Sequence, residues 1–322
     1  MRKATKIWMI VATSLLLAGG ILFAAVMTVL EWDFTKLSTE RIVTNTHEVR
    51  EPYRHISVTT DTADLELILS DGESTSVVCH ESAKATHRIE ARDGTLFIEL
   101  TDTREWYDHI NIGFADSPKI TVYLPAGMYG ALSVKGSTGD VRIPSNLSFA
   151  SMDIAVSTGD VSCQASADGD VKVKAGTGSI AVENMSAQAL FLSVSTGDVT
   201  VSDVTVHGNM TVSVSTGKSR LTHVTCKNFT SEGNTGDIIM TDVVVAEGMS
   251  INRSTGDVKF DRCDAAEIEI LTDTGDVTGT LISEKVFTYR TDTGDVKLPE
   301  STTGGRCKIT TDTGDIRITN SE

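Results

Sequence analysis

A three-residue motif, Thr-Gly-Asp, recurs along the second part of the chain at a nearly constant spacing. The motif or a close variant begins at ten threonines that are 19 or 20 residues apart, namely Thr138, Thr158, Thr177, Thr196, Thr216, Thr235, Thr255, Thr274, Thr293 and Thr313. A unit this short cannot bury an apolar face by itself, so neighbouring units must stack. The repeat therefore predicts a solenoid. Propeller blades need units of about 40 residues or more.

Apolar residues occupy fixed positions around each threonine. In the unit at Thr196 they are Leu190 and Leu192 before it, and Val199 and Val201 after it. A spacing of two on both sides of a glycine-containing turn, with many β-branched residues, indicates strand, turn and strand. The predicted fold is all-β: a β-solenoid, or single-stranded β-helix, of about ten coils whose like positions form apolar columns.

The region before these repeats follows the pattern less closely. Residues 60–67 align with residues 291–298, and a second degenerate unit centres on Asp93, Gly94 and Thr95. We expect divergent β coils or a small β-cap here, because the end of a solenoid exposes unpaired backbone groups. The predicted divisions are residues 1–30 (cytoplasmic stub and anchor), 31–54 (linker), 55–130 (cap) and 131–322 (regular solenoid).

The first thirty residues have the pattern of a transmembrane helix. Arg2, Lys3 and Lys6 precede an uncharged run over residues 7–30, which exceeds the roughly 20 residues needed to cross a bilayer. Basic residues before the run and Glu31 after it predict a single-pass membrane protein with a cytoplasmic N-terminus and an extracytoplasmic remainder. A cleaved signal peptide is the alternative, but its apolar part usually spans only about 7 to 15 residues.

Charge limits the class of partner. The chain has 28 basic and 44 acidic residues, a formal net charge of −16. Nucleic-acid binding depends on clustered cations, so we expect no nucleic-acid partner, and we expect membrane contact only through the N-terminal helix.

The anchor, the segment Ile120–Pro125 and the serial Thr-Gly-Asp-Val coils resemble the bacterial putative-adhesin family of β-solenoid proteins of unknown function. The resemblance implies an envelope-facing solenoid and supplies no catalytic residues. Three positions depart from the repeat: Ser179 and Lys218 replace the aspartate, and Ser231 is polar in an apolar column.

Aspartates occupy the turns of eight of the ten coils and are doubled in the last three coils. The favoured explanation is structural, because Thr and Asp side chains accept backbone hydrogen bonds in such turns. The alternative is weak Ca²⁺ binding, since hard cations prefer several oxygen ligands. The candidate ligands are Asp273, Asp276, Asp292, Asp295, Asp312 and Asp315. No other cofactor is expected.

The cysteines suggest packing and not metal binding. Cys163, Cys263 and Cys307 fall at positions that we expect to face inward, so we interpret them as small buried hydrophobic residues. His223 and Cys226 offer two ligands at most, without a second pair at zinc-like spacing.

Aromatic residues gather in the segment 101–118. Trp106, Tyr107 and Phe114 are candidates for contact with an envelope glycan or a protein partner. The alternative is that they cover the end of the solenoid as a lid.

No nucleophile elbow, phosphate loop or metal motif is found, so we expect no enzymatic activity. The predicted function is an extracytoplasmic adhesin, scaffold or envelope-sensing module. The alternative is a cation-dependent glycan-binding or glycan-processing β-helix protein. We also expect an open edge at the strand of Ile316 and Ile318, able to accept a strand from a second copy or a partner.

Overall fold

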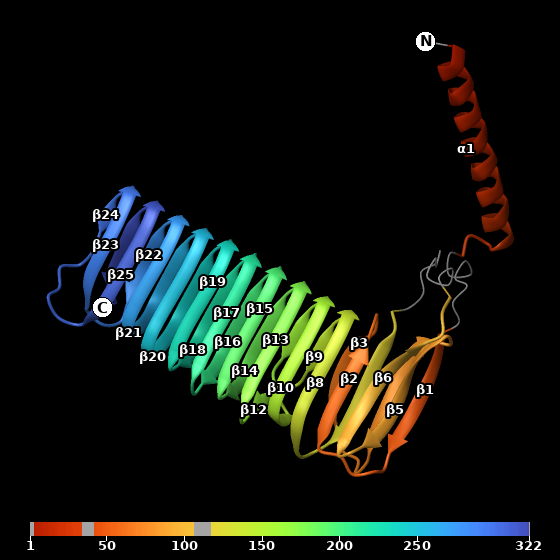
Figure 1. The fold of residues 1–322 in the computed structure, drawn as a ribbon, viewed down its shortest axis with the longest axis horizontal. Helices are drawn as coiled ribbons and strands as arrows, with labels where there is room; N and C mark the ends of the chain where they lie inside the picture. The colour runs from red at the N-terminus through yellow and green to blue at the C-terminus, as the bar shows by residue number, and fades with distance from the viewer. Residues whose placement is uncertain (1–2, 34–41, 106–116, 322) are drawn as a thin grey trace.

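The computed structural model describes residues 3–33, 42–105 and 117–321. One helix, α1 (Lys3–Val29), precedes an elongated β structure (Figure 1). The N-terminal strands are β1 (Ile42–Val49), β2 (His55–Thr60), β3 (Asp64–Ser70), β4 (Thr75–Ser82), β5 (Ala85–Arg92), β6 (Thr95–Asp102) and β7 (Lys119–Pro125).

The remaining strands build the regular coils. They are β8 (Met128–Thr138), β9 (Val141–Ile143), β10 (Ser148–Thr158), β11 (Val161–Cys163), β12 (Ser166–Ala167), β13 (Asp170–Thr177), β14 (Ile180–Ala187), β15 (Ala189–Thr196), β16 (Val199–Val206), β17 (Asn209–Thr216), β18 (Ser219–Cys226), β19 (Asn228–Thr235), β20 (Ile238–Thr255), β21 (Val258–Thr274), β22 (Val277–Leu281), β23 (Lys285–Thr293), β24 (Val296–Lys297), β25 (Gly305–Thr313) and β26 (Ile316–Asn320).

Helix α1 has the length and apolarity of a membrane span. Within Thr5–Val29 an 18-residue window has a mean hydropathy of 2.3, and none of that window is buried against the rest of the chain. Among the described residues this is the one helix long and apolar enough to cross a bilayer. A signal sequence near the N-terminus can meet the same criteria of length and apolarity.

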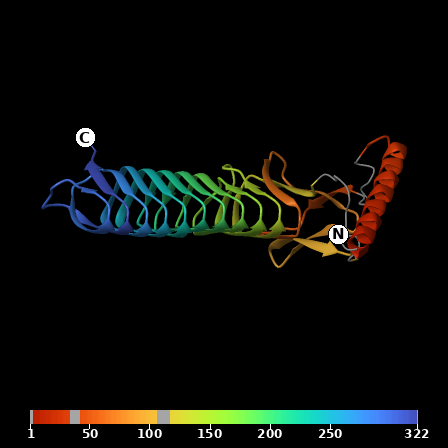
Figure 2. The ribbon, with the colours of Figure 1, turned by 90° about the horizontal axis from the view of Figure 1, so that it is seen from above.

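The predicted β-solenoid is confirmed. Strands before the turn pair in parallel with their counterparts in the next coil, as Val171 of β13 does with Leu190 of β15. Strands after the turn do the same, as Ile180 of β14 does with Val199 of β16. The coils therefore stack as one row along the rod (Figures 1 and 2), and the predicted apolar positions form columns inside it.

Five consecutive coils, those of Thr177 to Thr255, have a second corner that the repeat analysis did not include. Seven residues after the motif threonine, non-glycine residues adopt positive φ, as at Asn184 (53°), Asp203 (55°) and His223 (52°). The chain bends there, so the residues eight and ten positions after the threonine, such as Val204 and Val206, also point inward and are buried. Two further apolar columns result.

The motif glycines are required by backbone packing. Gly236 has φ of 130°, and a Cβ atom there would lie 1.9 Å from the carbonyl oxygen of Gly217 in the neighbouring coil. Such a distance is far inside van der Waals contact, and positive φ also disfavours L-residues. The turns stack this closely because no side chain separates them.

The last two coils are not stacked in sequence order. Strand β25 lies between β21 and β23, with Ile309 paired to Ile270 on one side and Tyr289 on the other. Strand β26 likewise lies between β22 and β24. The expectation that the strand of Ile316 and Ile318 forms the open edge is therefore wrong, because that coil is inserted and residues 285–298 form the outermost coil (Figure 1).

The N-terminal region is a cap that continues the stack. Strand β2 pairs with β8 on one side and with β6 on the other, and β3 pairs with β9 and β7 in the same way. Residues 55–70 are thus a divergent coil, as expected. The unit at Asp93 and Gly94 is instead the turn of an antiparallel hairpin, β5–β6, because both residues adopt positive φ and reverse the chain.

A buried arginine explains the polar residue Ser231. Arg253 is fully buried, and its Nη2 donates to Oγ of Ser231 (2.7 Å) and of Ser219 (3.2 Å). Its guanidinium passes over Gly233, where a Cβ atom would lie 1.7 Å from Nη1. The missing side chain at residue 233 therefore provides the space for Arg253.

We predict that Gly236→Ala destabilises the solenoid by about 2–5 kcal/mol, through positive-φ strain and backbone overlap. Thermal unfolding followed by circular dichroism measures the change. Gly127→Ala is the matched control, because nothing lies within 4 Å of a Cβ atom there, and its effect should stay within about 0.5 kcal/mol. Equal effects would contradict the stacking geometry.

The inserted coil makes a second prediction. Ile309→Ala removes a side chain packed between two coils and should cost about 2–5 kcal/mol, whereas Tyr289→Ala, at a residue 55% exposed, should cost about 1 kcal/mol or less. Denaturant unfolding of each variant checks the difference. If the coils stacked in sequence order, Tyr289→Ala would destabilise the protein more than Ile309→Ala.

Candidate functional site

The aspartates of the turns form a hydrogen-bonded ladder between coils. Asp140 Oδ1 accepts a hydrogen bond from the backbone N–H of Asp160 (2.9 Å), and Asp160 Oδ1 accepts one from that of Ser179 (2.7 Å). The same bond runs from Asp315 to Asp276 and from Asp295 to Asp315, which follows the inserted coil order. These carboxylates therefore bind backbone groups, as the structural explanation predicts.

Basic residues offset part of the repulsion along this ladder. Lys218, which replaces an aspartate, pairs with Asp237 (Nζ–Oδ2 3.4 Å), and Lys259 pairs with Asp257 (2.9 Å). The hydrogen bond from Lys259 lowers the pKa of Asp257, and the backbone N–H of Asp276 lowers it further. The ladder is thus partly neutralised at intervals.

The six calcium candidates lie at the end of the rod where the coil order changes. Thr313 is paired with both Thr274 and Thr293, so the coils stack in the order Asp273, Asp312 and Asp292. The described residues contain one cluster of three metal-type side chains whose donor atoms lie within 4.8 Å of one another, and it includes none of these aspartates. Calcium binding here stays a prediction.

His223 and Cys226 do not come together as ligands. His223 lies at the second corner, where its Nδ1 is 3.1 Å from Asp203 and its Nε2 is 3.5 Å from Asp242. Arg262 continues this corner by pairing with Asp242, and that hydrogen bond lowers the pKa of Asp242. Cys226 is buried in an apolar column.

The described cysteines are all unpaired and buried. Burial raises the pKa of the Cys163 and Cys307 thiols to about 12 and that of Cys263 to about 11. These three residues are therefore protonated packing residues, as predicted.

The aromatic candidates Trp106, Tyr107 and Phe114 lie outside the described residues. The segment that carries them connects β6 to β7, which pair with β2 and β3 respectively. Whether it contacts a partner stays a prediction.

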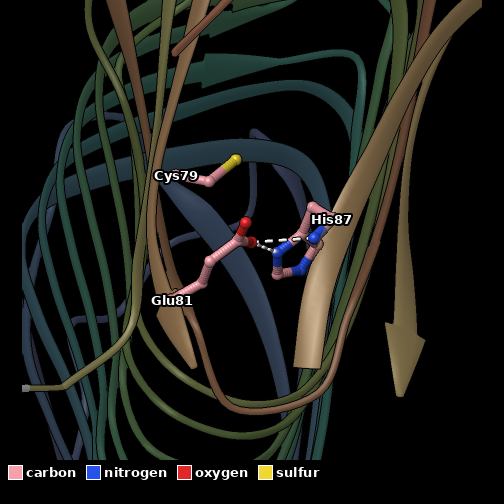
Figure 3. A group of neighbouring side chains, drawn as sticks. All are labelled: Cys79, Glu81 and His87. Carbon is pink, nitrogen blue, oxygen red and sulfur yellow. Dashed lines mark hydrogen bonds and ion pairs between the residues drawn. The ribbon is translucent and has the colours of Figure 1, made fainter. Parts of the chain in front are cut away.

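The cap contains a polar cluster that sequence analysis did not find. Cys79 and Glu81 on β4 and His87 on β5 are all buried, and their side chains converge (Figure 3). Glu81 Oε2 lies 2.7 Å from His87 Nδ1 and accepts the backbone N–H of His87 (2.8 Å). The sequence carried only part of this signal: residues 79 and 81 share a strand face, but β4 and β5 pair only at Ser82 and Ala85, so the turn alone does not place residue 87 beside them.

The end of the rod opposite the cap has an exposed apolar surface, which we name the tip. It consists of Phe287, Tyr289, Val296 and Leu298, which occupy the four column positions that are buried in the neighbouring coil. Tyr289 is 55% and Val296 36% exposed, and the other two are half-buried. Residues 299–302 complete the rim of this shallow surface. In the described structure, β23 pairs only with β25 and β24 only with β26, so each is paired on one side.

The chain is a capped β-solenoid protein with one apolar N-terminal helix. A sequence model of the family described as Toastrack DUF4097 matches residues 53–215 and 206–322. The matches cover most of the cap and the whole solenoid, so the chain belongs to the Toastrack DUF4097 family. This agrees with the family resemblance inferred from the repeats.

Several solved structures are similar to the chain. A putative adhesin from Parabacteroides distasonis ATCC 8503 has 12% sequence identity and a TM-score of 0.44, over 76% of this chain and 98% of that one. A putative lipid binding protein from the same strain has 17% identity and a TM-score of 0.45, over 74% and 97%. A putative adhesin from Parabacteroides merdae ATCC 43184 has 9% identity and a TM-score of 0.43, over 76% and 98%. No curated protein matches the chain in sequence.

We predict that Asp257→Asn weakens the acid sensitivity of the fold. The pKa of Asp257 is lowered in the folded state, so its stabilisation is complete above the unfolded pKa of about 3.9 and is lost as the pH falls through the folded value. The variant should lower the Tm at pH 7 by no more than a few degrees and show a shallower fall in Tm below about pH 4.

Thermal melts between about pH 7 and pH 2.5 check this prediction, since that window spans the carboxylate pKa. Asp153→Asn, on the exposed wall of the rod, is the control and should keep the wild-type pH profile. If Asp257→Asn keeps the wild-type dependence of Tm on pH, Asp257 does not contribute to the loss of stability in acid.

Proposed function

We propose that this protein is a non-enzymatic, membrane-anchored β-solenoid that presents its tip to a protein partner outside the cytoplasm, as an adhesion or scaffold module. Helix α1 is the anchor in this proposal. The basic residues Arg2, Lys3 and Lys6 before the apolar run, and Glu31 after it, support a cytoplasmic N-terminus.

The observation that carries the proposal is the exposure of column residues at the tip. In the inner coils, side chains at these positions are covered from both sides, whereas Tyr289 and Val296 are covered from one side. Apolar side chains beside unpaired strand edges favour the addition of a strand from another chain. The tip also lies at the end of the rod away from α1 (Figure 1), where a tethered protein would meet a partner.

The wall of the rod supports a non-enzymatic role. The turn aspartates, which are its most regular acidic groups, accept backbone hydrogen bonds from neighbouring coils. An acidic pair for glycoside hydrolysis needs two carboxyl groups free to act on a substrate. These aspartates are instead part of the scaffold.

Vesicle clustering tests the proposal. The full chain is reconstituted into liposomes, and clustering is followed by light scattering, alone and with vesicles carrying envelope protein extracts. We expect clustering through self-association or a partner, and we expect Tyr289→Glu combined with Val296→Glu to reduce it at least tenfold, because two charges would have to be buried in the contact.

The control for this experiment changes the wall and leaves the tip intact. Val244→Glu and Leu271→Glu replace residues that are 42% and 43% exposed, so their exposure is similar to that of the tip residues. These variants should cluster like the wild type. Equal clustering by the tip variant, or equal loss in the wall variant, would contradict a role for the tip.

A further inference from the structure

The buried cluster in the cap brings together three different metal-binding groups. Cys79 supplies a thiol, Glu81 a carboxylate and His87 an imidazole, and their donor atoms lie within 4.8 Å of one another (Figure 3). Relative exposures are 0% for Cys79, 1% for Glu81 and 5% for His87. Burying a carboxylate and an imidazole side by side is costly unless both are well partnered.

Each polar ligand has a second partner that orients it. Asn45 Nδ2 donates to Glu81 Oε1 (2.7 Å), which leaves Oε2 facing His87. Thr60 Oγ1 lies 3.2 Å from His87 Nε2, so Nε2–H can donate to Thr60 while Nδ1 faces the cluster. Metal-binding histidines typically donate their second ring N–H in this way.

We propose that Cys79, Glu81 and His87 bind one divalent metal ion of the zinc type. Sulfur, nitrogen and a single carboxylate are ligands that Zn²⁺ accepts, whereas Ca²⁺ requires six to eight oxygens. A tetrahedral ion places its ligand atoms about 3.3–3.6 Å apart. Binding therefore widens the 2.7 Å separation of His87 Nδ1 and Glu81 Oε2 by well under 1 Å.

The charges balance in the bound state. A divalent ion with one thiolate, one carboxylate and a neutral imidazole has no net charge, which suits a buried site. Binding releases the thiol proton of Cys79. Affinity should therefore fall about tenfold for each pH unit of acidification.

Cobalt provides an optical test. The full chain is stripped with a chelator and refolded in detergent with Co²⁺ present, because the site is buried. We expect a thiolate-to-cobalt charge-transfer band that saturates at one equivalent and disappears when Zn²⁺ is added, and a Kd, measured by competition with a chelator, that is about tenfold higher at pH 6 than at pH 7. Absence of the band in the wild type would overturn the proposal and leave the cluster as a hydrogen-bond network.

Matched cysteine variants assign the band. Cys79→Ser should abolish it, and Cys163→Ser should retain it, since Cys163 is equally buried but lies in an apolar column. The Tm of each variant without metal reports whether it folds. A band of equal intensity in Cys79→Ser would also overturn the proposal.

Discussion

The close stacking of backbone at the Thr-Gly-Asp turn determines the rest of this structure. At Gly197, Gly217 and Gly236 a Cβ atom would lie 1.9–2.0 Å from the carbonyl oxygen of the preceding turn. One turn of each coil is therefore fixed against the next without side chains between them. A fixed turn sets the strand register on both sides, and the register in turn aligns the apolar columns and the aspartate ladder.

Much of this arrangement could be predicted from the sequence because it is periodic. The four columns and the structural role of the aspartates follow from spacing. The order of the last coils does not, because Phe287 and Cys307 hold the same repeat position, so the local pattern cannot say which coil lies outside. The match between Arg253 and Gly233 also escapes a periodic analysis, because it is unique to one pair of coils.

The cap cluster shows a different limit. Cys79 and Glu81 lie two residues apart on one strand, so their shared face was predictable, but their burial depends on which face the cap turns inward. His87 lies on β5, which pairs with β4 only at Ser82 and Ala85 and otherwise with β6, so its approach to Cys79 and Glu81 depends on tertiary packing. Sequence analysis interpreted residues 93 and 94 as the turn of a solenoid coil and not of a hairpin. It therefore could not identify the strands that lie next to β5.

At each end of a solenoid the last strands have backbone groups without a partner coil, and the two ends of this rod differ in how these edges are covered. At both ends the order of the strands in space differs from their order in the chain. Strand β2 lies between β6 and β8, and β25 lies between β21 and β23, so both are paired on two sides. At the cap, antiparallel strands extend the sheet beyond this point: β5 pairs with β6, and β4 with β7. At the other end, β24 is two residues long and Val296 stays exposed. Since apolar columns end in the open only at the tip of the described structure, the two ends of the rod differ, and the exposed apolar surface lies at the end away from α1 (Figure 1).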